Sequence, residues 1–323
     1  MSNKAKVKVA AETSHELARP RTGTLRKRIY AHRYLFMMLL PCIAWFVVFS
    51  YIPMVGLILA FKEFKYNMGM LRSPWVGLHY FRAFFAYYQS THLILNTFWV
   101  GFIKIVLSFP FPIIFALMLN EVRNRRFKRV AQTISYLPHF LSWVVVASLV
   151  QKLLAPNEGL INQLLALLGG DGSTFWLMEE RYFYQIMFTS NLWKGLGWGS
   201  IIYLAAIAGI DPTLYEAAEV DGANWFWKMI YVTLSEIRST IGILLILSLG
   251  EILRTGFEQN FLLRTPGNMN AADILDVYVL RMGLMQGQFG YATAIGMLQG
   301  VAGLIMVVSA NYLSRKFTEV SLW

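Results

Sequence analysis

Residues 34–61 read YLFMMLLPCIAWFVVFSYIPMVGLILAF, a run of 28 residues that contains no charged side chain. Arg33 precedes this run and Lys62 follows it. A helix needs about 20 largely apolar residues to cross the hydrocarbon core of a bilayer. The run is long enough to do so, and it therefore predicts a helix that spans a membrane.

The rest of the chain contains further runs of this kind. Four of them are long enough to cross a bilayer, although two are interrupted by a single lysine, Lys104 or Lys194. A shorter run has only 12 uncharged residues, between Arg238 and Glu251, so hydropathy alone leaves it open as a buried or re-entrant segment. We predict an all-α membrane protein with six transmembrane helices, at about 34–61, 93–120, 130–151, 182–210, 238–256 and 290–314.

The composition of the whole chain supports this class. Of its 323 residues, 56% are hydrophobic and 15% are charged, against roughly 25% charged residues in an ordinary soluble domain. A single soluble core stops growing near ~250–300 residues, so a soluble enzyme could not bury this much apolar surface. The one cysteine, Cys42, excludes an internal disulfide framework and a Cys-rich zinc site.

The distribution of charge predicts the orientation in the membrane. The net charge of +11 arises from 29 Lys and Arg residues against 18 Asp and Glu residues. Nine basic residues precede the first predicted span, and five lie within residues 123–129. Because Lys and Arg accumulate on the cytoplasmic side, we predict a multi-pass protein of the cytoplasmic (inner) membrane with both termini in the cytoplasm.

The predicted spans divide the chain into a tail and a membrane domain. Residues 1–32 form a basic cytoplasmic tail, and residues 33–323 form the transmembrane domain. A basic segment beside a membrane is typical of contact with anionic lipid. No base-reading module accompanies the tail, so we expect membrane lipid and no nucleic acid among its partners.

The sequence contains no pattern typical of a catalytic, metal or cofactor site. Its five histidines form no HExxH or comparable ligand pair, and it has no G-x-x-x-x-G-K-[ST] phosphate-binding loop. The glycines at 195, 197 and 199 lie inside an apolar run rather than after a soluble strand, which argues against dinucleotide binding. We therefore expect no enzyme activity and no bound metal or cofactor in this chain.

The segment between the fourth and fifth predicted spans begins DPTLYEAAEVDGANWFWK, from Asp211 onward. Asp211 before Pro212 is a typical helix start, because the Asp side chain caps the first turn and proline at the first position loses no hydrogen bond. We expect the helix to reach Val220, where Gly222 can supply the positive-φ turn that ends it. A second short helical piece over 223–234 would complete a compact knob, which could be a solvated loop or a docking element.

Three short motifs in this segment carry a family resemblance: Glu216-Ala217-Ala218, Asp221-Gly222-Ala223 and Val232-Thr233-Leu234. Their spacing resembles the E-A-A-x3-G signature of permease subunits in binding-protein-dependent ABC importers. The likeness covers about residues 30–323 and is greatest to the carbohydrate-uptake branch, in particular to permeases for alginate oligosaccharides. It extends to Trp75–Phe81, Trp193–Trp198, Gly256–Gln259, Gln288–Ala294 and Ser321–Trp323. Ser235 departs from the pattern, because family members commonly have proline after the Thr-Leu pair.

This resemblance implies a type I ABC importer permease that moves an oligosaccharide, alginate-like and anionic in the nearest likeness, by alternating access. The segment 211–235 would be the coupling segment, with its first helix seated in a cleft of a separate ATPase subunit. Glu216 would pair with a basic residue there, and Ala217, Ala218, Asp221, Gly222 and Ala223 would complete the contact. The implied partners are a second homologous permease, two ATPase subunits that bind ATP and Mg²⁺, and an external solute-binding protein.

Polar residues inside the predicted spans are candidates for the substrate path, because ionisable groups at membrane depth usually face the protein interior. Asn191, Lys194 and Trp198 share one helical face, and Lys104 lies in the second span. Hydrogen-bonding groups beside aromatic planes suit sugars, and a uronate substrate would add a reason for lysine. Alternatively, each lysine pairs with a carboxylate such as Glu251 or extends its ammonium to the membrane surface.

Two other classes of protein remain as alternatives. An ion-coupled secondary carrier of sugars would favour internal pseudo-repeats and carboxylates near the midplane, but the sequence has no visible repeat and only Glu251 is a candidate. A membrane-embedded enzyme would need a cluster of carboxylates or histidines inside the spans, and none is visible in the sequence. Co-isolation of an ATP-hydrolysing partner would distinguish the importer from both.

Overall fold

The computed structural model describes residues 32–254 and 256–318. Regular structure in these residues is helical, apart from one isolated bridge between Lys62 and Trp75. The chain divides into two compact units, residues 1–57 and residues 58–323, and each is described by itself. The prediction of an all-α chain is confirmed.

The first unit contains most of the run that predicts the first span. In it, α3 (Arg33–Phe46), η1 (Val47–Tyr51) and α4 (Ile52–Met54) follow one another. The helical stretch continues through η2 (Val55–Phe61), which gives 29 residues long and apolar enough to cross a membrane. This agrees with the span predicted at 34–61.

Two further spans lie in the second unit. The first combines α7 (Ser90–Phe102), η3 (Ile103–Leu107) and α8 (Pro110–Glu121), and it corresponds to the span predicted at 93–120. The second lies in α19 (Phe289–Thr318), of which Phe289–Tyr312 has the length and composition of a span. This agrees with the span predicted at 290–314.

The other three predicted spans correspond to pairs of helices with a sharp bend between them. The bends are 101°, 72° and 61°, and the described residues contain up to six candidate spans if each pair counts as one. The pairs are α9 (Arg125–Tyr136) and η4 (Leu137–Phe140) with α10 (Trp143–Leu153); α12 (Glu180–Ala208) with α13 (Pro212–Val220); and α14 (Trp225–Trp227) and η5 (Lys228–Leu234) with α15 (Arg238–Gly250).

Two predicted boundaries need correction. The span predicted at 130–151 is not one continuous helix, because the helical path stops at Phe140 and α10 starts anew at Trp143. Pro138 lies in the last turn before the break and has no N–H to donate, while the Ser142 side chain accepts the Val145 N–H and caps the next helix. The fifth span, predicted to reach residue 256, ends as a helix at Gly250 and continues as a turn.

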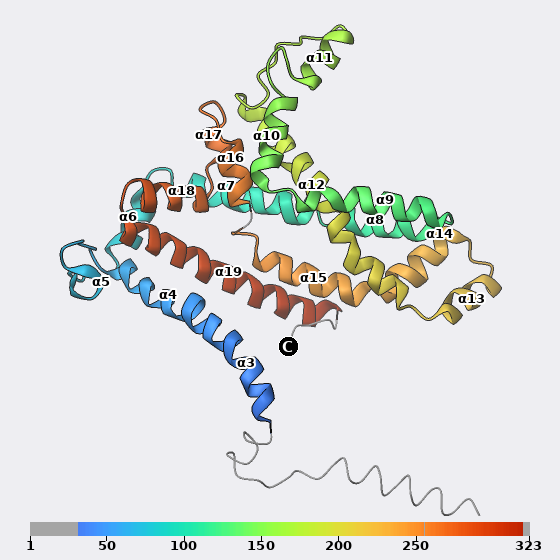
Figure 1. Cartoon of the computed structure of the whole chain (residues 1–323), viewed down its shortest axis with the longest axis horizontal. Coiled ribbons are helices and arrows are strands. Elements are labelled where there is room, and N and C mark those ends of the chain that lie inside the picture. The colour runs from blue at the N-terminus through green and yellow to red at the C-terminus, as the bar shows by residue number, and fades with distance from the viewer. Residues whose placement is uncertain (1–31, 255, 319–323) are drawn as a thin grey trace, which may run out of the picture. The chain divides into compact units, whose positions relative to one another are not determined.

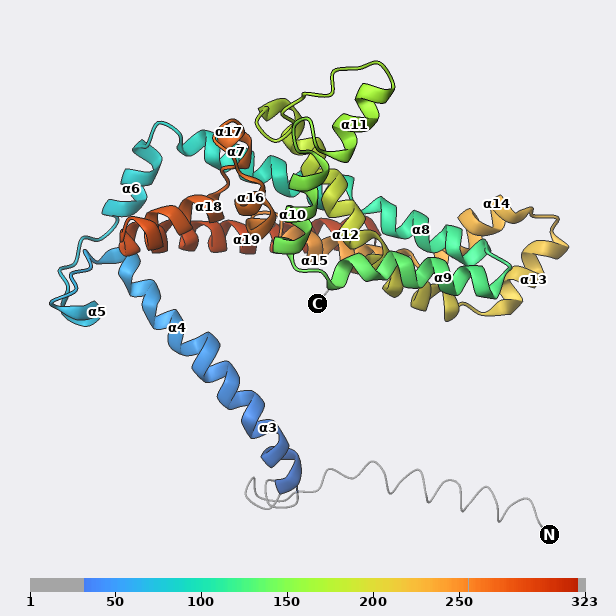
Figure 2. The same cartoon turned by 45° about the horizontal axis from the view of Figure 1, so that its top comes forward.

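Long helices of the second unit pack side by side (Figures 1 and 2). α8 and α9 lie along α12, and α15 lies along α19. The crossing of α9 and α12 requires glycine, because a Cβ on Gly197 would collide with the main-chain oxygen of Ser135. A buried cluster that includes Val100, Phe183 and Leu263 joins α7 and α12 to α16. The remaining helices are α5 (Gly69–Arg72), α6 (His79–Ala86), α11 (Leu160–Leu167), α16 (Phe257–Leu263), α17 (Met269–Ala272), α18 (Leu275–Leu280) and η6 (Arg281–Met285).

Successive long helices of the second unit run in alternating directions, so that different elements gather at its two ends. The end of α8, the start of α9, the end of α12, and all of α13 and α14 gather at one end (Figures 1 and 2). The α6 and α18 helices and the start of α19 lie at the other. This alternation brings the basic residues 123–129 to the same end as the segment 211–235.

Candidate coupling segment and substrate path

The segment 211–235 forms the knob that its sequence predicts. The Asp211 carboxylate accepts the N–H of Thr213 at 2.9 Å, and Pro212 is the first residue of α13. These hydrogen bonds lower the pKa of Asp211 below its ordinary value. The helix ends at Val220, and Gly222 adopts a φ of +80°. The predicted helix start, helix end and glycine turn are all confirmed.

Contacts between the two short helices fix their relative position. The hydroxyl groups of Tyr215 and Thr233 are 2.9 Å apart, within hydrogen-bond distance. Lys228 pairs with Glu219 at 3.6 Å, and the Asn224 side chain caps the second piece by accepting the N–H of Trp227. The two short helices are therefore joined by side-chain contacts on both sides of the turn.

The outer surface of the knob is exposed and has the character of a docking surface. Glu216 and Ala217 are exposed, and Val220 exposes 88% of its surface at the end of the helix. Among the described residues the Glu216 side chain has no hydrogen-bond or ion-pair partner. An exposed carboxylate beside small and apolar residues can be approached closely by a basic surface of another protein.

Lys194 forms hydrogen bonds at the interruption between η4 and α10, within the third span. Its ammonium donates to the main-chain oxygens of His139 at 2.7 Å and Leu141 at 2.6 Å. Trp198, one turn along α12, stacks on the His139 ring with a centroid distance of 4.4 Å. Lys194 therefore satisfies carbonyl groups that the interrupted helix leaves without their usual N–H partners.

Trp143 brings the two candidate lysines together. The ammonium of Lys104 lies 5.5 Å from the centroid of the Trp143 ring, and that of Lys194 lies 5.7 Å from the same centroid. Lys104 is 7% exposed and lies against Gly256, where an added Cβ would collide with the Lys104 ammonium and the Asn260 amide nitrogen. No sequence pattern signals this cluster, because Trp143 is one of several aromatic residues in an apolar run.

A buried polar group next to Lys104 contains two further residues that sequence reasoning missed, Gln259 and Asn260. Gln259 donates to the main-chain oxygen of Met187 and to the Ser190 hydroxyl, both at 2.8 Å. The side-chain oxygens of Gln259 and Asn260 are buried and accept no hydrogen bond from the described residues. Because buried polar atoms are normally hydrogen-bonded, each of these oxygens could accept a hydrogen bond from a buried water, but both side chains are fully buried and a sugar does not reach them in this conformation.

Asn191 lies on the same face of α12 as Lys194, as predicted. Its amide nitrogen donates to the Ser108 hydroxyl at 3.4 Å, which links α12 to the second span. The structure thus brings Lys104, Lys194 and Trp143 together, whereas Trp198 contacts His139 at the break. The combined region offers cations, an aromatic plane and amide groups within one unit.

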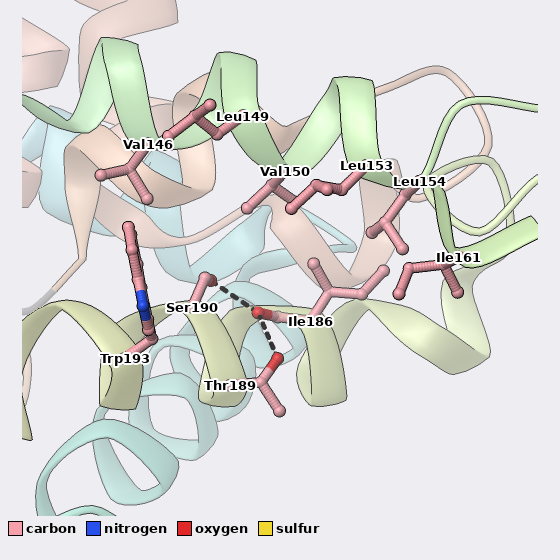
Figure 3. Close-up of a pocket in the computed structure, with 10 residues that line it drawn as sticks. All are labelled: Val146, Leu149, Val150, Leu153, Leu154, Ile161, Ile186, Thr189, Ser190 and Trp193. Atoms are coloured by element: carbon pink, nitrogen blue, oxygen red, sulfur yellow. Dashed lines mark hydrogen bonds between the residues drawn. The ribbon is translucent and has the colours of Figure 1, made fainter. Parts of the chain in front are cut away.

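A separate pocket of about 390 Å³ lies between α10 and α12 (Figure 3). The Thr189 and Ser190 hydroxyls on its wall both donate to the main-chain oxygen of Ile186, so they are engaged already. Its lining residues are Val146, Leu149, Val150, Leu153, Leu154, Ile161, Ile186, Thr189, Ser190 and Trp193. This lining is apolar and does not supply the hydrogen-bonding groups that a sugar requires.

Comparison with known proteins finds related transport proteins. The family described as "Binding-protein-dependent transport system inner membrane component" matches residues 108–319. The polygalacturonan/rhamnogalacturonan transport system permease protein YteP of Bacillus subtilis is 43% identical over 92% of this chain and 92% of that protein. Protein LplB of the same organism is 40% identical over 90% of this chain and 91% of that protein.

Solved structures show the same likeness. A chain from the crystal structure of a bacterial ABC transporter involved in the import of the acidic polysaccharide alginate is 41% identical, with a TM-score of 0.85. The match covers 91% of this chain and 99% of that chain. A second structure, of a bacterial alginate ABC transporter in complex with an alginate pentasaccharide-bound periplasmic protein, gives 40% identity, a TM-score of 0.85 and coverage of 92% and 99%.

Proposed function

This chain belongs to the family of binding-protein-dependent transport system inner membrane components, and from that premise we propose that it is the permease subunit of an ATP-driven oligosaccharide importer. The observation that carries the proposal is the exposed knob of α13 and α14, with Glu216 and Gly222 in the places that the family motif gives them. The family consists of transport components rather than enzymes, and the described residues contain three helices suited to a membrane, or up to six if each bent pair is one span.

The knob is proposed to couple transport to ATP hydrolysis. We assign ATP and Mg²⁺ to two separate ATPase subunits, one of which would receive α13 in a cleft and pair a basic residue with Glu216. Ala217 and Ala218 would allow close approach, while Asp221, Gly222 and Ala223 form the turn. Closure of the ATPases would then displace the braced knob and switch the permease between inward- and outward-facing states, each favoured by its own ligand.

A second permease subunit and an external solute-binding protein complete the proposed assembly. The proposed orientation places both termini and the knob in the cytoplasm, because the basic residues 123–129 lie at the knob end of the second unit. The solute-binding protein would then approach the opposite end, where α6 and α18 lie. It would deliver the oligosaccharide to the outward-facing state.

The substrate is proposed to be an anionic oligosaccharide that passes Lys104, Asn191, Lys194 and Trp198. Similar proteins are named for polygalacturonan and for the acidic polysaccharide alginate, and uronic acids carry a carboxylate on each sugar ring. The ammonium groups beside Trp143 suit such a substrate, since a cation attracts the carboxylate and the indole can stack on the sugar ring.

The coupling role is tested by Gly222→Asp, with Gly169→Asp as a matched control. Both glycines have positive φ, +80° and +83°, and neither has a neighbour within 4 Å of an added Cβ, so the local strain is comparable. We expect Gly222→Asp to reduce co-purification of the ATPase and to abolish ATP hydrolysis stimulated by the loaded solute-binding protein. The control should behave as the wild type. Full stimulated hydrolysis in the Gly222 variant would refute the assignment.

A further inference from the structure

The loop before α9 and the first turns of that helix carry a concentrated positive charge. Five of the seven residues 123–129 are basic, and no acidic residue lies among them. In the described part of the chain, none of the five forms an ion pair. They are Arg123, Arg125, Arg126, Lys128 and Arg129, and all except the half-buried Lys128 are exposed. Such a cluster attracts an anionic partner from outside the chain.

The same helix exposes an apolar stripe that begins within the basic cluster. Phe127, Val130, Ile134 and Leu137 are exposed to between 55% and 66%, and they recur at the spacing of one helical face. Another face of α9 packs on α12, where Ser135 meets Gly197. The stripe runs from Phe127 to Leu137, the first residue of η4, and so covers eleven residues, or about 15 Å of helix, which is about half of the ~30 Å hydrocarbon core of a bilayer.

Exposed aromatic residues mark the level of the membrane surface at this end of the unit. Trp225, Trp227 and Tyr231 are exposed on α14 and η5, and the Trp227 and Tyr231 rings stack on each other. These elements lie at the same end as the start of α9 (Figures 1 and 2). Because Trp and Tyr concentrate at the interface between membrane and water, these rings favour a headgroup depth for the basic cluster, which would let the apolar stripe reach into one leaflet.

We propose that residues 123–137 form a binding surface for anionic phospholipids, on which the cations hold the headgroup phosphates and the apolar stripe of α9 contacts the acyl chains. A docked soluble ATPase could neutralise the same charges, but it would leave the 15 Å stripe uncovered. A phospholipid matches both the basic cluster and the apolar stripe. Its anionic headgroup would meet the basic residues, and its acyl chains would lie along the stripe. The surface belongs to the membrane domain and does not depend on the substrate.

The test compares the full-length wild type with the variant R125Q/R126Q/R129Q, and with a charge-matched control, R72Q/R82Q/K152Q, whose three arginine and lysine side chains are also exposed but lie outside residues 123–137. Each purified protein is titrated in detergent with phosphatidylglycerol or with zwitterionic phosphatidylcholine, and bound lipid is counted by native mass spectrometry. The basic tail is unchanged in all three proteins, so its contribution cancels.

We expect the R125Q/R126Q/R129Q variant to bind phosphatidylglycerol about 100-fold more weakly, since each basic residue near a membrane surface contributes about fivefold. The control should bind as the wild type, and phosphatidylcholine should not distinguish the three proteins. Raised salt should weaken the wild type towards the variant. Should the triple variant be poorly folded, R126Q alone is expected to lose about fivefold.

Three results would overturn the proposal. Unchanged phosphatidylglycerol binding in a folded R125Q/R126Q/R129Q variant would show that this surface does not hold the lipid. Loss of a co-purifying ATPase subunit from that variant, with unchanged lipid binding, would assign the charges to a protein contact instead. An equal loss in the control variant would mean that net charge alone governs lipid binding.

Discussion

Replacement of Lys194 by methionine tests how the third span keeps its bend. The substitution retains most of the side-chain length and removes the ammonium that donates to His139 and Leu141. Two carbonyl oxygens at the interruption between η4 and α10 then lose their donor. We expect the break to lose its fixed geometry and α10 to lose its support.

The cost can be worked from the two hydrogen bonds. Interhelical hydrogen bonds in membranes average about 0.6 kcal/mol and reach ~1.7 kcal/mol, and bonds from a charged donor belong to the stronger class. The two short bonds of Lys194, at 2.7 and 2.6 Å, therefore contribute about 2–3 kcal/mol together. Lys194→Arg keeps a charged donor and should lose less.

Thermal unfolding of the purified protein, followed by tryptophan fluorescence in one detergent, measures this effect. Lys104→Met is the matched control, because Lys104 is buried but donates no hydrogen bond to the described residues. Removing an unpaired buried cation should leave the unfolding temperature unchanged or raise it. If Lys194→Met unfolds at the wild-type temperature, the carbonyl contacts do not hold the break and the reasoning is refuted.

Three further predictions concern other parts of the molecule. In a variant without the native cysteine, a cysteine at Val220 should resist a membrane-impermeant thiol reagent applied to intact cells, whereas one at Leu168 should react; the reverse pattern would invert the proposed orientation. Asn96 donates to the main-chain oxygens of Ala271 and Asp273, so Asn96→Ala should cost about 2–3 kcal/mol in unfolding experiments; no loss would exclude a structural role. The lowered pKa of Asp211 means that its helix cap is present above the ordinary pKa of Asp and is lost as the pH falls through the lowered value. Asp211→Ala should therefore reduce stimulated ATP hydrolysis at neutral pH, and Asp211→Asn should retain it.

Features set by local sequence could be predicted from it. The span at 34–61 follows from an uninterrupted apolar run, and the start and end of α13 follow from Asp211, Pro212 and Gly222. In these places the residues that specify the structure lie within one or two turns of one another. The sequence pattern is therefore enough to predict these elements.

Features that depend on contacts between distant segments could not be predicted in this way. Hydropathy does not reveal the bend after Phe140, because the residues on both sides are apolar. Only Pro138 and Ser142 indicate it. The sequence also indicates that Lys194 lies at membrane depth. It does not indicate the hydrogen bonds to His139 and Leu141, because their carbonyl oxygens are accessible to Lys194 only where the helix is interrupted. The meeting of Lys104 and Lys194 at Trp143 depends in turn on how α10 leaves that break.

The central claim is that this chain converts ATP hydrolysis by partner subunits into import of an oligosaccharide. The most direct test is to purify the full-length chain from its native membrane, reconstitute it in vesicles and measure ATP hydrolysis with and without the loaded solute-binding protein. The account predicts a co-purifying ATPase whose hydrolysis rises with the loaded protein and falls to the basal rate in Gly222→Asp. Uptake driven by an ion gradient, with no ATP-hydrolysing subunit in the preparation, would contradict it and favour a secondary carrier.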